Sequence, residues 1–94
     1  DLGGIYNIGG ASDGVAQALK ETGRDHKVVL VGHGLTPDTR ALLIDGSMDA
    51  VITQNPLHTI MSCVRIFANL RDGRATLSGV EATRSQVIFR ENLP

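Results

Sequence analysis

Short apolar runs alternate along this chain with segments in which apolar residues recur every three or four positions. Runs rich in β-branched residues are typical of strands, and the three- and four-residue spacing is typical of helices. The expected strands cover residues 4–8, 27–31, 50–53 and 86–89, and the expected helices lie between 12 and 23, at 37–44 and at 56–70. This β-α-β-α-β-α-β order predicts an α/β fold with a parallel sheet and right-handed crossovers.

The stretch 27–37 organises the rest of the chain. Its apolar run 28–31 is stopped by Gly32, which predicts a strand that is buried on both faces. Thr36 before Pro37 predicts an N-cap followed by the first helical residue. The loop between strand and helix therefore lies at the carboxyl edge of the sheet, where open α/β folds bind ligands.

The other helix starts follow the same logic. Ser12 is the expected N-cap of the first helix, and Asn55 before Pro56 is the expected start of the longest one. In that longest helix the three- and four-residue spacing predicts a buried stripe, and we expect Cys63 to be buried in it as a small apolar residue. The stripe consists of Leu57, Ile60, Met61, Val64, Phe67, Ala68 and Leu70.

Composition narrows the function classes. The 94 residues carry a net charge of −1 and three aromatic side chains, so we expect no binding of DNA or of an anionic membrane by this segment. The chain has one cysteine, so we expect no internal disulfide and a reducing, cytoplasmic location. The three histidines lack metal-ligand spacing, and we expect no metal, no cofactor and no enzyme activity. The chain opens with Asp1 rather than Met, so we expect the numbering to start inside a longer polypeptide.

Three features could carry chemistry. The glycine-rich turn 9–14 lacks the spacing of a dinucleotide fingerprint and the lysine of a Walker loop, which favours a tight turn over a phosphate loop. His33 follows a strand and has no nucleophile partner in the sequence, so packing in the loop and ligand contact are its two alternatives. Gln54 ends the third strand, and its amide either bonds to its own loop or binds a hydroxyl-rich ligand.

The succession of motifs resembles the C-terminal third of the lac-repressor and ribose-binding-protein family, which is periplasmic-binding-protein-like. The resemblance rests on the stretches GIYNIGGASDGVAQAL, KVVLVGHG, DAVITQNP and QVIFRENLP. It implies two α/β lobes joined by three crossovers, with a sugar between them. By that likeness, residues 1–54 belong to the C-terminal lobe, 55–84 to a helix and connection of the N-terminal lobe, and 85–94 to a returning strand and tail.

The resemblance also implies a ligand site. The family's ligand residues match Ile8-Gly9, Gly34 and Gln54, and Gln54 keeps the family's polar side chain. Ile8-Gly9 stands where the family has Asn-Asp, and Gly34 stands where it has Asp. Asn7 and His33 are therefore the expected substitutes. These departures leave room for a noncanonical or phosphorylated ligand.

The leading hypothesis is therefore the effector-binding region of a lac-repressor-type transcription regulator. The resemblance implies a carbohydrate effector, a homodimer, and operator DNA bound through a headpiece that precedes this segment. The alternative is a solute-binding protein of a sugar transporter.

Overall fold

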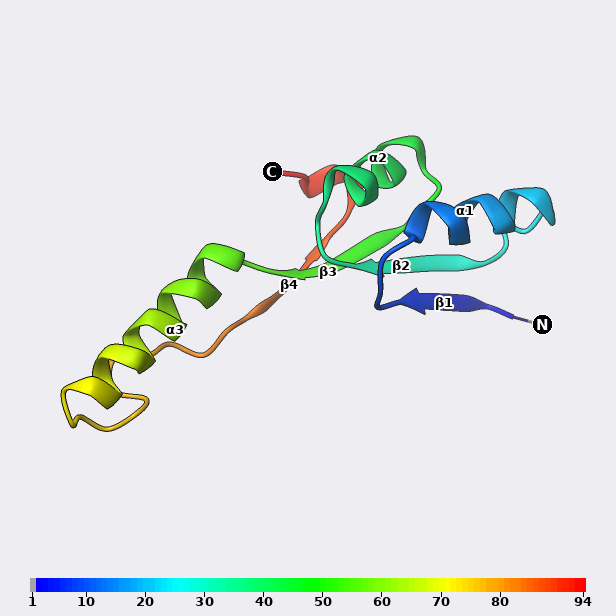
Figure 1. Ribbon diagram of the computed structural model, residues 1–94. Helices are drawn as coiled ribbons and strands as arrows, with labels where there is room; N and C mark the ends of the chain where they lie inside the picture. Colours follow the sequence, from blue (N-terminus) through cyan, green and yellow to red (C-terminus); the bar gives the residue numbers. More distant parts are fainter. Residues whose placement is uncertain (1) are drawn as a thin grey trace. The chain divides into compact units, whose positions relative to one another are not determined.

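A computed structural model describes residues 2–94, and each expected helix and strand is present in it (Figure 1). Their bounds lie within a few residues of the expected ones. The elements are β1 (Gly4–Asn7), α1 (Ser12–Glu21), β2 (Val29–His33), α2 (Pro37–Asp45), β3 (Ala50–Gln54), α3 (Pro56–Arg71), β4 (Ser85–Ile88) and a short 3-10 helix η1 (Arg90–Asn92). The chain divides into two compact units, residues 2–53 with 86–94 and residues 54–85.

The strands of the first unit form one sheet in the order β1-β2-β3-β4. β1 pairs in parallel with β2, and β2 pairs in parallel with β3, with Gly32 opposite both Asn7 and Val51. Figure 1 shows β4 running in the opposite direction along the outer side of β3. The predicted α/β class is confirmed, and the sheet is mostly rather than wholly parallel.

The core lies between this sheet and the helices α1 and α2, which cover one of its faces (Figure 1). Leu30 and Val51 are fully buried at its centre, and Leu43 reaches them from α2. Val29, the neighbour of Leu30, is 52% exposed. The prediction that β2 is buried on both faces is therefore wrong for the described chain, because alternate side chains of a strand point to opposite faces and the helices α1 and α2 cover only one.

Two of the three expected helix caps are confirmed. Thr36 accepts a hydrogen bond from the Thr39 N–H, and Asn55 Oδ1 accepts from the N–H groups of Leu57 and His58. The Ser12 cap is wrong. Ala11 is the N-cap of α1, in a left-handed conformation and without a side-chain cap, and Ser12 lies buried inside the first turn.

At the far end of α2 the Asp45 carboxylate accepts a hydrogen bond of 2.7 Å from the Ser47 N–H. Hydrogen bonds from the Ser47 side chain and backbone hold the pKa of Asp45 below its usual value. Gly46 between them adopts the left-handed conformation that ends many helices. This turn directs the chain from α2 back towards β3.

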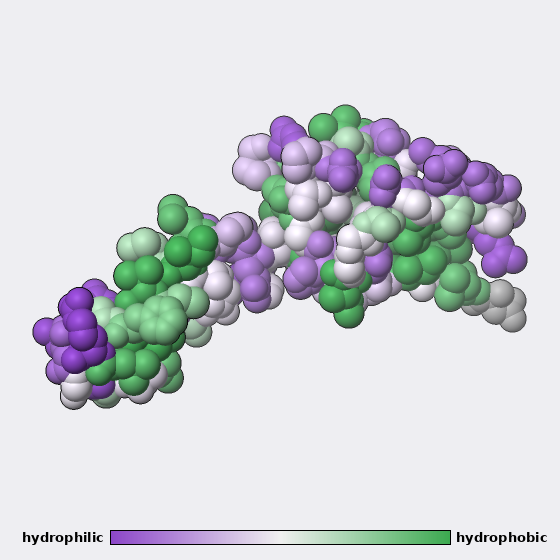
Figure 2. Space-filling model, viewed as in Figure 1, coloured by the Kyte–Doolittle hydropathy of each residue, from purple (hydrophilic) through white to green (hydrophobic). Residues whose placement is uncertain are grey.

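The second unit consists of α3 and the segment that follows it. The buried Asn69 side chain donates to the carbonyl groups of Thr76 and Ser78, at 3.0 and 2.8 Å, and so holds this segment against the helix. Among the described residues, the apolar stripe of α3 is exposed except for the half-buried Ala68. Apolar side chains gather along α3 in Figure 2. Cys63 is exposed too, so its predicted burial is wrong here, because the stripe meets no described partner.

Gly32 has closer neighbours than the other glycines of the first unit. A Cβ at this position would lie 2.7 Å from Met48 Cε and 2.9 Å from Met48 Sδ. Both atoms belong to the flexible end of the Met48 side chain, but Met48 is buried, so a shift of this end changes the packing of the core. Gly14, in contrast, lies in α1 without a positive φ angle, and a Cβ there would have open space for 4 Å around it.

We expect Gly32→Ala to lower the free energy of unfolding by about 1–3 kcal/mol, the usual effect of overpacking. Gly14→Ala, the matched control, should raise it by about 0.5–1 kcal/mol, because alanine favours the helix. Urea unfolding of the two variants and the parent protein measures both changes. A Gly32→Ala variant as stable as Gly14→Ala would contradict the close approach.

Candidate ligand-binding site

A hollow of about 180 Å³ lies at the carboxyl edge of β1 and β2. The turn after β1 forms one wall, and the end of β2 with the start of α2 forms the other. Such hollows arise because neighbouring parallel strands end at the same edge and their loops meet there. The lining residues are Gly9, Gly10, Ala11, Ser12, Asp13, His33, Thr36, Asp38 and Thr39.

Asn7 holds the first wall in shape. Its Nδ2 group donates to the carbonyl oxygens of Gly9 and Gly10, at 3.2 and 3.1 Å, and to Ser12 Oγ at 2.9 Å. One amide thus ties the end of β1 to the turn and to the first residue of α1. The Asn7 side chain, which was expected to bind ligand, therefore stabilises the turn that forms this wall.

The second wall is held by two threonines. Thr39 Oγ1 donates to the Gly34 carbonyl at 2.8 Å and accepts from the Thr36 N–H at 2.8 Å. Thr36 Oγ1 in turn accepts a hydrogen bond from the Thr39 N–H, so the two residues form a capping box. Gly34 has a φ of 90°, a left-handed conformation that favours glycine, and its N–H donates to Ile52 at 2.9 Å.

His33, the last residue of β2, lines the hollow and is bonded to β1. Its Nδ1 atom lies 2.6 Å from the Tyr6 hydroxyl, and the two rings are tilted at 53° with their centroids 6.1 Å apart. The bond fixes the ring relative to the neighbouring strand. His33 is thus neither loose nor packed in a loop.

The structure brings together two of the five expected site residues, Gly9 and His33. Asn7 and Gly34 support the two walls, and Gln54 ends β3 in the second unit, so their roles in binding stay predictions. Sequence reasoning missed the polar side chains of Asp13, Thr36, Asp38 and Thr39 as lining residues. Their positions in the turns and first helical turns that follow β1 and β2 could have identified them, because these segments lie at the carboxyl edge of the sheet.

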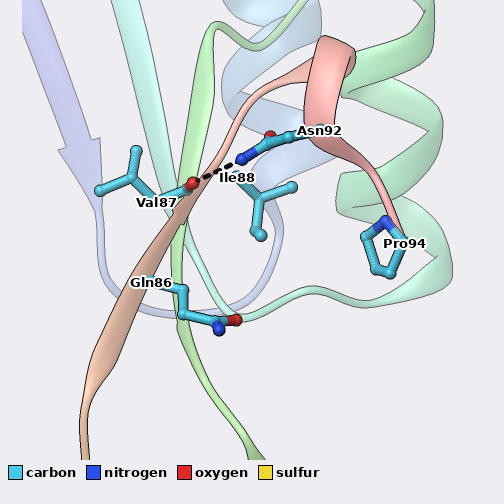
Figure 3. A pocket seen from close by; sticks show the side chains of 5 residues that line it. All are labelled: Gln86, Val87, Ile88, Asn92 and Pro94. Atoms are coloured by element: carbon cyan, nitrogen blue, oxygen red, sulfur yellow. Dashed lines mark hydrogen bonds between the residues drawn. The ribbon is translucent and has the colours of Figure 1, made fainter.

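Two further hollows are more open. One, of about 430 Å³, lies beside β4, where Asn92 Nδ2 donates to the Val87 carbonyl (Figure 3). The other, of about 330 Å³, lies in the second unit, where His58 and Glu81 approach to 3.5 Å. Among residues 2–94 no three His, Cys, Asp or Glu side chains are placed to hold a metal ion. Within the same residues, no helix has the length and apolarity needed to cross a membrane.

Fold and hollow together define an α/β domain with a polar site at the carboxyl edge of its parallel strands. The chain belongs to the periplasmic binding protein domain family, whose sequence pattern matches residues 1–75. No curated protein matches the sequence.

Solved structures show the same fold. The chain is similar to GanP, a glucose-galactose binding protein from Geobacillus stearothermophilus, with 25% identity and a TM-score of 0.86 over 100% of this chain and 34% of that one. It is also similar to an ABC transporter solute-binding protein from Agrobacterium vitis with bound D-fucose, with 24% identity and a TM-score of 0.77 over 98% and 32%. A third, from Actinobacillus succinogenes with bound D-allose, has 21% identity and a TM-score of 0.75 over 94% and 31%. The chain spans about a third of the length of these proteins.

The role of Asn7 can be tested by reversing its chemistry. Asn7→Asp replaces a donor by a carboxylate that faces two carbonyl groups, so we expect a loss of about 1–3 kcal/mol in the free energy of unfolding. Asn92→Asp is the control, because the Asn92 side chain also donates to a carbonyl but lies beside β4. This variant should not alter the hollow at the ends of β1 and β2. Chemical unfolding measures the stability of each variant, and the NMR chemical shifts of Gly9 and Gly10 report the shape of the turn. Unchanged shifts in Asn7→Asp would contradict the role of the Asn7 amide in holding the turn.

Proposed function

We propose that this chain forms one wall of a carbohydrate-binding site. The observation that carries the proposal is the hollow at the ends of β1 and β2, lined by hydroxyl, carboxylate and imidazole groups in a periplasmic-binding-protein fold. Such groups match sugar hydroxyls, which both donate and accept hydrogen bonds. At about 180 Å³ the hollow is smaller than a usual ligand pocket, so it would hold part of a ligand whose remainder lies against other residues.

We further propose that the whole protein is a lac-repressor-type transcription regulator in the cytoplasm, not an enzyme. The support is the sequence resemblance, above all Gln54-Asn55-Pro56 and the Phe89-Arg90-Glu91-Asn92 ending. In this proposal a sugar effector changes the equilibrium between two lobe arrangements of a homodimer, and thereby the affinity of its headpieces for operator DNA. The alternative is a solute-binding protein of a sugar transporter, the role that the descriptions of two similar solved structures give for those proteins.

Binding of sugar tests the first proposal. In the full natural protein, calorimetric titration with D-glucose, D-galactose, D-fucose, D-allose and D-arabinose should show saturable binding of at least one. Gln54→Ala should weaken that binding by about 1–3 kcal/mol, because a ligand hydroxyl would lose its partner. The variant should still fold, because Gln54 is exposed and its loss removes no core volume. Gln17→Ala, on an exposed part of α1, is the matched control. Unchanged affinity would remove Gln54 from the site, and equal losses of affinity and stability would make it a structural residue.

DNA binding separates the regulator from the transporter protein. Residues 1–94 alone should not shift DNA in a gel at low salt, because their net charge is −1. The full natural protein should bind an operator fragment from its own promoter region, and the sugar found by titration should change that affinity. Specific binding by residues 1–94 alone would contradict the assigned role of the segment, and no binding by the full protein would favour the transporter reading.

A further inference from the structure

The hydrogen bond between Tyr6 and His33 decides which polar group of the His33 ring is left for other partners. Tyr6 lies opposite Val31 across β1 and β2, and His33, two residues further along β2, lies on the same face of the sheet as Val31. Diagonal neighbours of this kind are within reach of aromatic side chains. The contact of 2.6 Å between the Tyr6 hydroxyl and His33 Nδ1 therefore follows from the register of the two strands.

The length of this bond indicates which atom donates. N–H···O bonds are usually about 2.9–3.0 Å long, whereas hydroxyl donors form shorter bonds of about 2.5–3.0 Å. At 2.6 Å the Tyr6 hydroxyl is therefore the donor and His33 Nδ1 is the acceptor. A neutral imidazole whose Nδ1 accepts carries its proton on Nε2. Among residues 2–94, His33 Nε2 has no hydrogen-bond partner.

The hollow otherwise offers a ligand more acceptors than donors. The carboxylates of Asp13 and Asp38 can only accept when they are ionised, and the Thr39 hydroxyl already donates to the Gly34 carbonyl. A sugar hydroxyl needs a donor for its oxygen as well as an acceptor for its proton. The Nε2–H group of His33 is a donor of that kind, on a residue that lines the hollow.

We infer that Tyr6 is a positioning residue, which holds the His33 ring with its Nε2–H group free to donate to a ligand oxygen. The inference rests on the proposed carbohydrate function and adds a residue that does not itself line the hollow. It also gives His33 one role, that of a hydrogen-bond donor to the ligand, where the sequence left packing as an alternative.

NMR of the His33 ring tests the assigned tautomer. In the full natural protein at about pH 8.5, where histidine side chains are ordinarily neutral, the nitrogen chemical shifts of His33 should show a protonated Nε2 and an unprotonated Nδ1. Tyr6→Phe removes only the hydroxyl, and the Nδ1 shift should move towards that of a ring nitrogen without a hydrogen bond. A parent protein with its proton on Nδ1 overturns the inference, and so does an Nδ1 shift that Tyr6→Phe leaves unchanged.

Calorimetric titration tests the positioning itself. The parent protein and its variants are titrated with D-glucose, D-galactose, D-fucose, D-allose and D-arabinose. Tyr6→Phe should weaken the binding of a sugar that the parent binds on the order of two- to tenfold, the range that one neutral hydrogen bond covers. His33→Gln keeps an N–H donor near the place of Nε2 but has no Nδ1, so the addition of Tyr6→Phe to this variant should cause no further loss.

Thr22→Val is the matched control, because it removes another hydroxyl that donates a hydrogen bond, at the opposite end of α1. It should change neither the affinity nor the His33 shifts, and melting temperatures show whether each variant is folded. Equal affinity of Tyr6→Phe and the parent overturns the inference and leaves the carbohydrate function standing. The same loss from Tyr6→Phe with and without His33→Gln also overturns it, because Tyr6 would then act without His33. If no sugar binds the parent protein, the proposed function fails and the inference fails with it.

Discussion

The sheet depends on a clasp between Asp49 and the backbone of Leu30. The Asp49 N–H donates to the Leu30 carbonyl at 2.9 Å, while the Asp49 carboxylate accepts from the Leu30 N–H at 2.8 Å. A buried backbone group without a partner would be costly, and Leu30 is fully buried, so the clasp satisfies both of its polar groups. It also fixes where β3 begins beside β2. A slip by one residue would turn Val51 out of the core and Ile52 into it.

The register of β1 against β2 determines where the hollow forms. With Gly32 opposite Asn7, β1 and β2 end at the same level, and the turns that follow them meet. The absence of a side chain at Gly32 lets Met48 approach the sheet, and Ser12 Oγ lies beside the same position. Ser12 then accepts from Asn7, so the packing of the core and the shape of the first wall share residues. The site is a consequence of strand alignment more than of any single motif.

Sequence reasoning found what is decided locally. Thr36-Pro37 and Asn55-Pro56 start helices through contacts within three residues, so both caps could be predicted. The prediction of Ser12 as an N-cap was wrong because the Asn7 amide, at the end of the preceding strand, donates to the Ser12 hydroxyl. This contact forms only when the chain folds. Val29 and Cys63 were expected to be buried, but both are exposed. An apolar pattern in the sequence shows that a surface is apolar, and it does not show whether another element packs against that surface. Asp38 belongs to no motif in the sequence, and its place in the hollow depends on how the ends of β1 and β2 meet.

The position of β4 in the chain has a consequence for the order of assembly. β1, β2 and β3 follow one another within residues 4–54, whereas residues 55–84 intervene before β4. Closing a connection of that length costs on the order of 3 kcal/mol in chain entropy. As the chain emerges from the ribosome, the outer edge of β3 and the place of Ile88 stay open until β4 has been synthesised. An unpaired edge is a template for strands of other chains, so this interval is when a nascent chain is most exposed to misassembly.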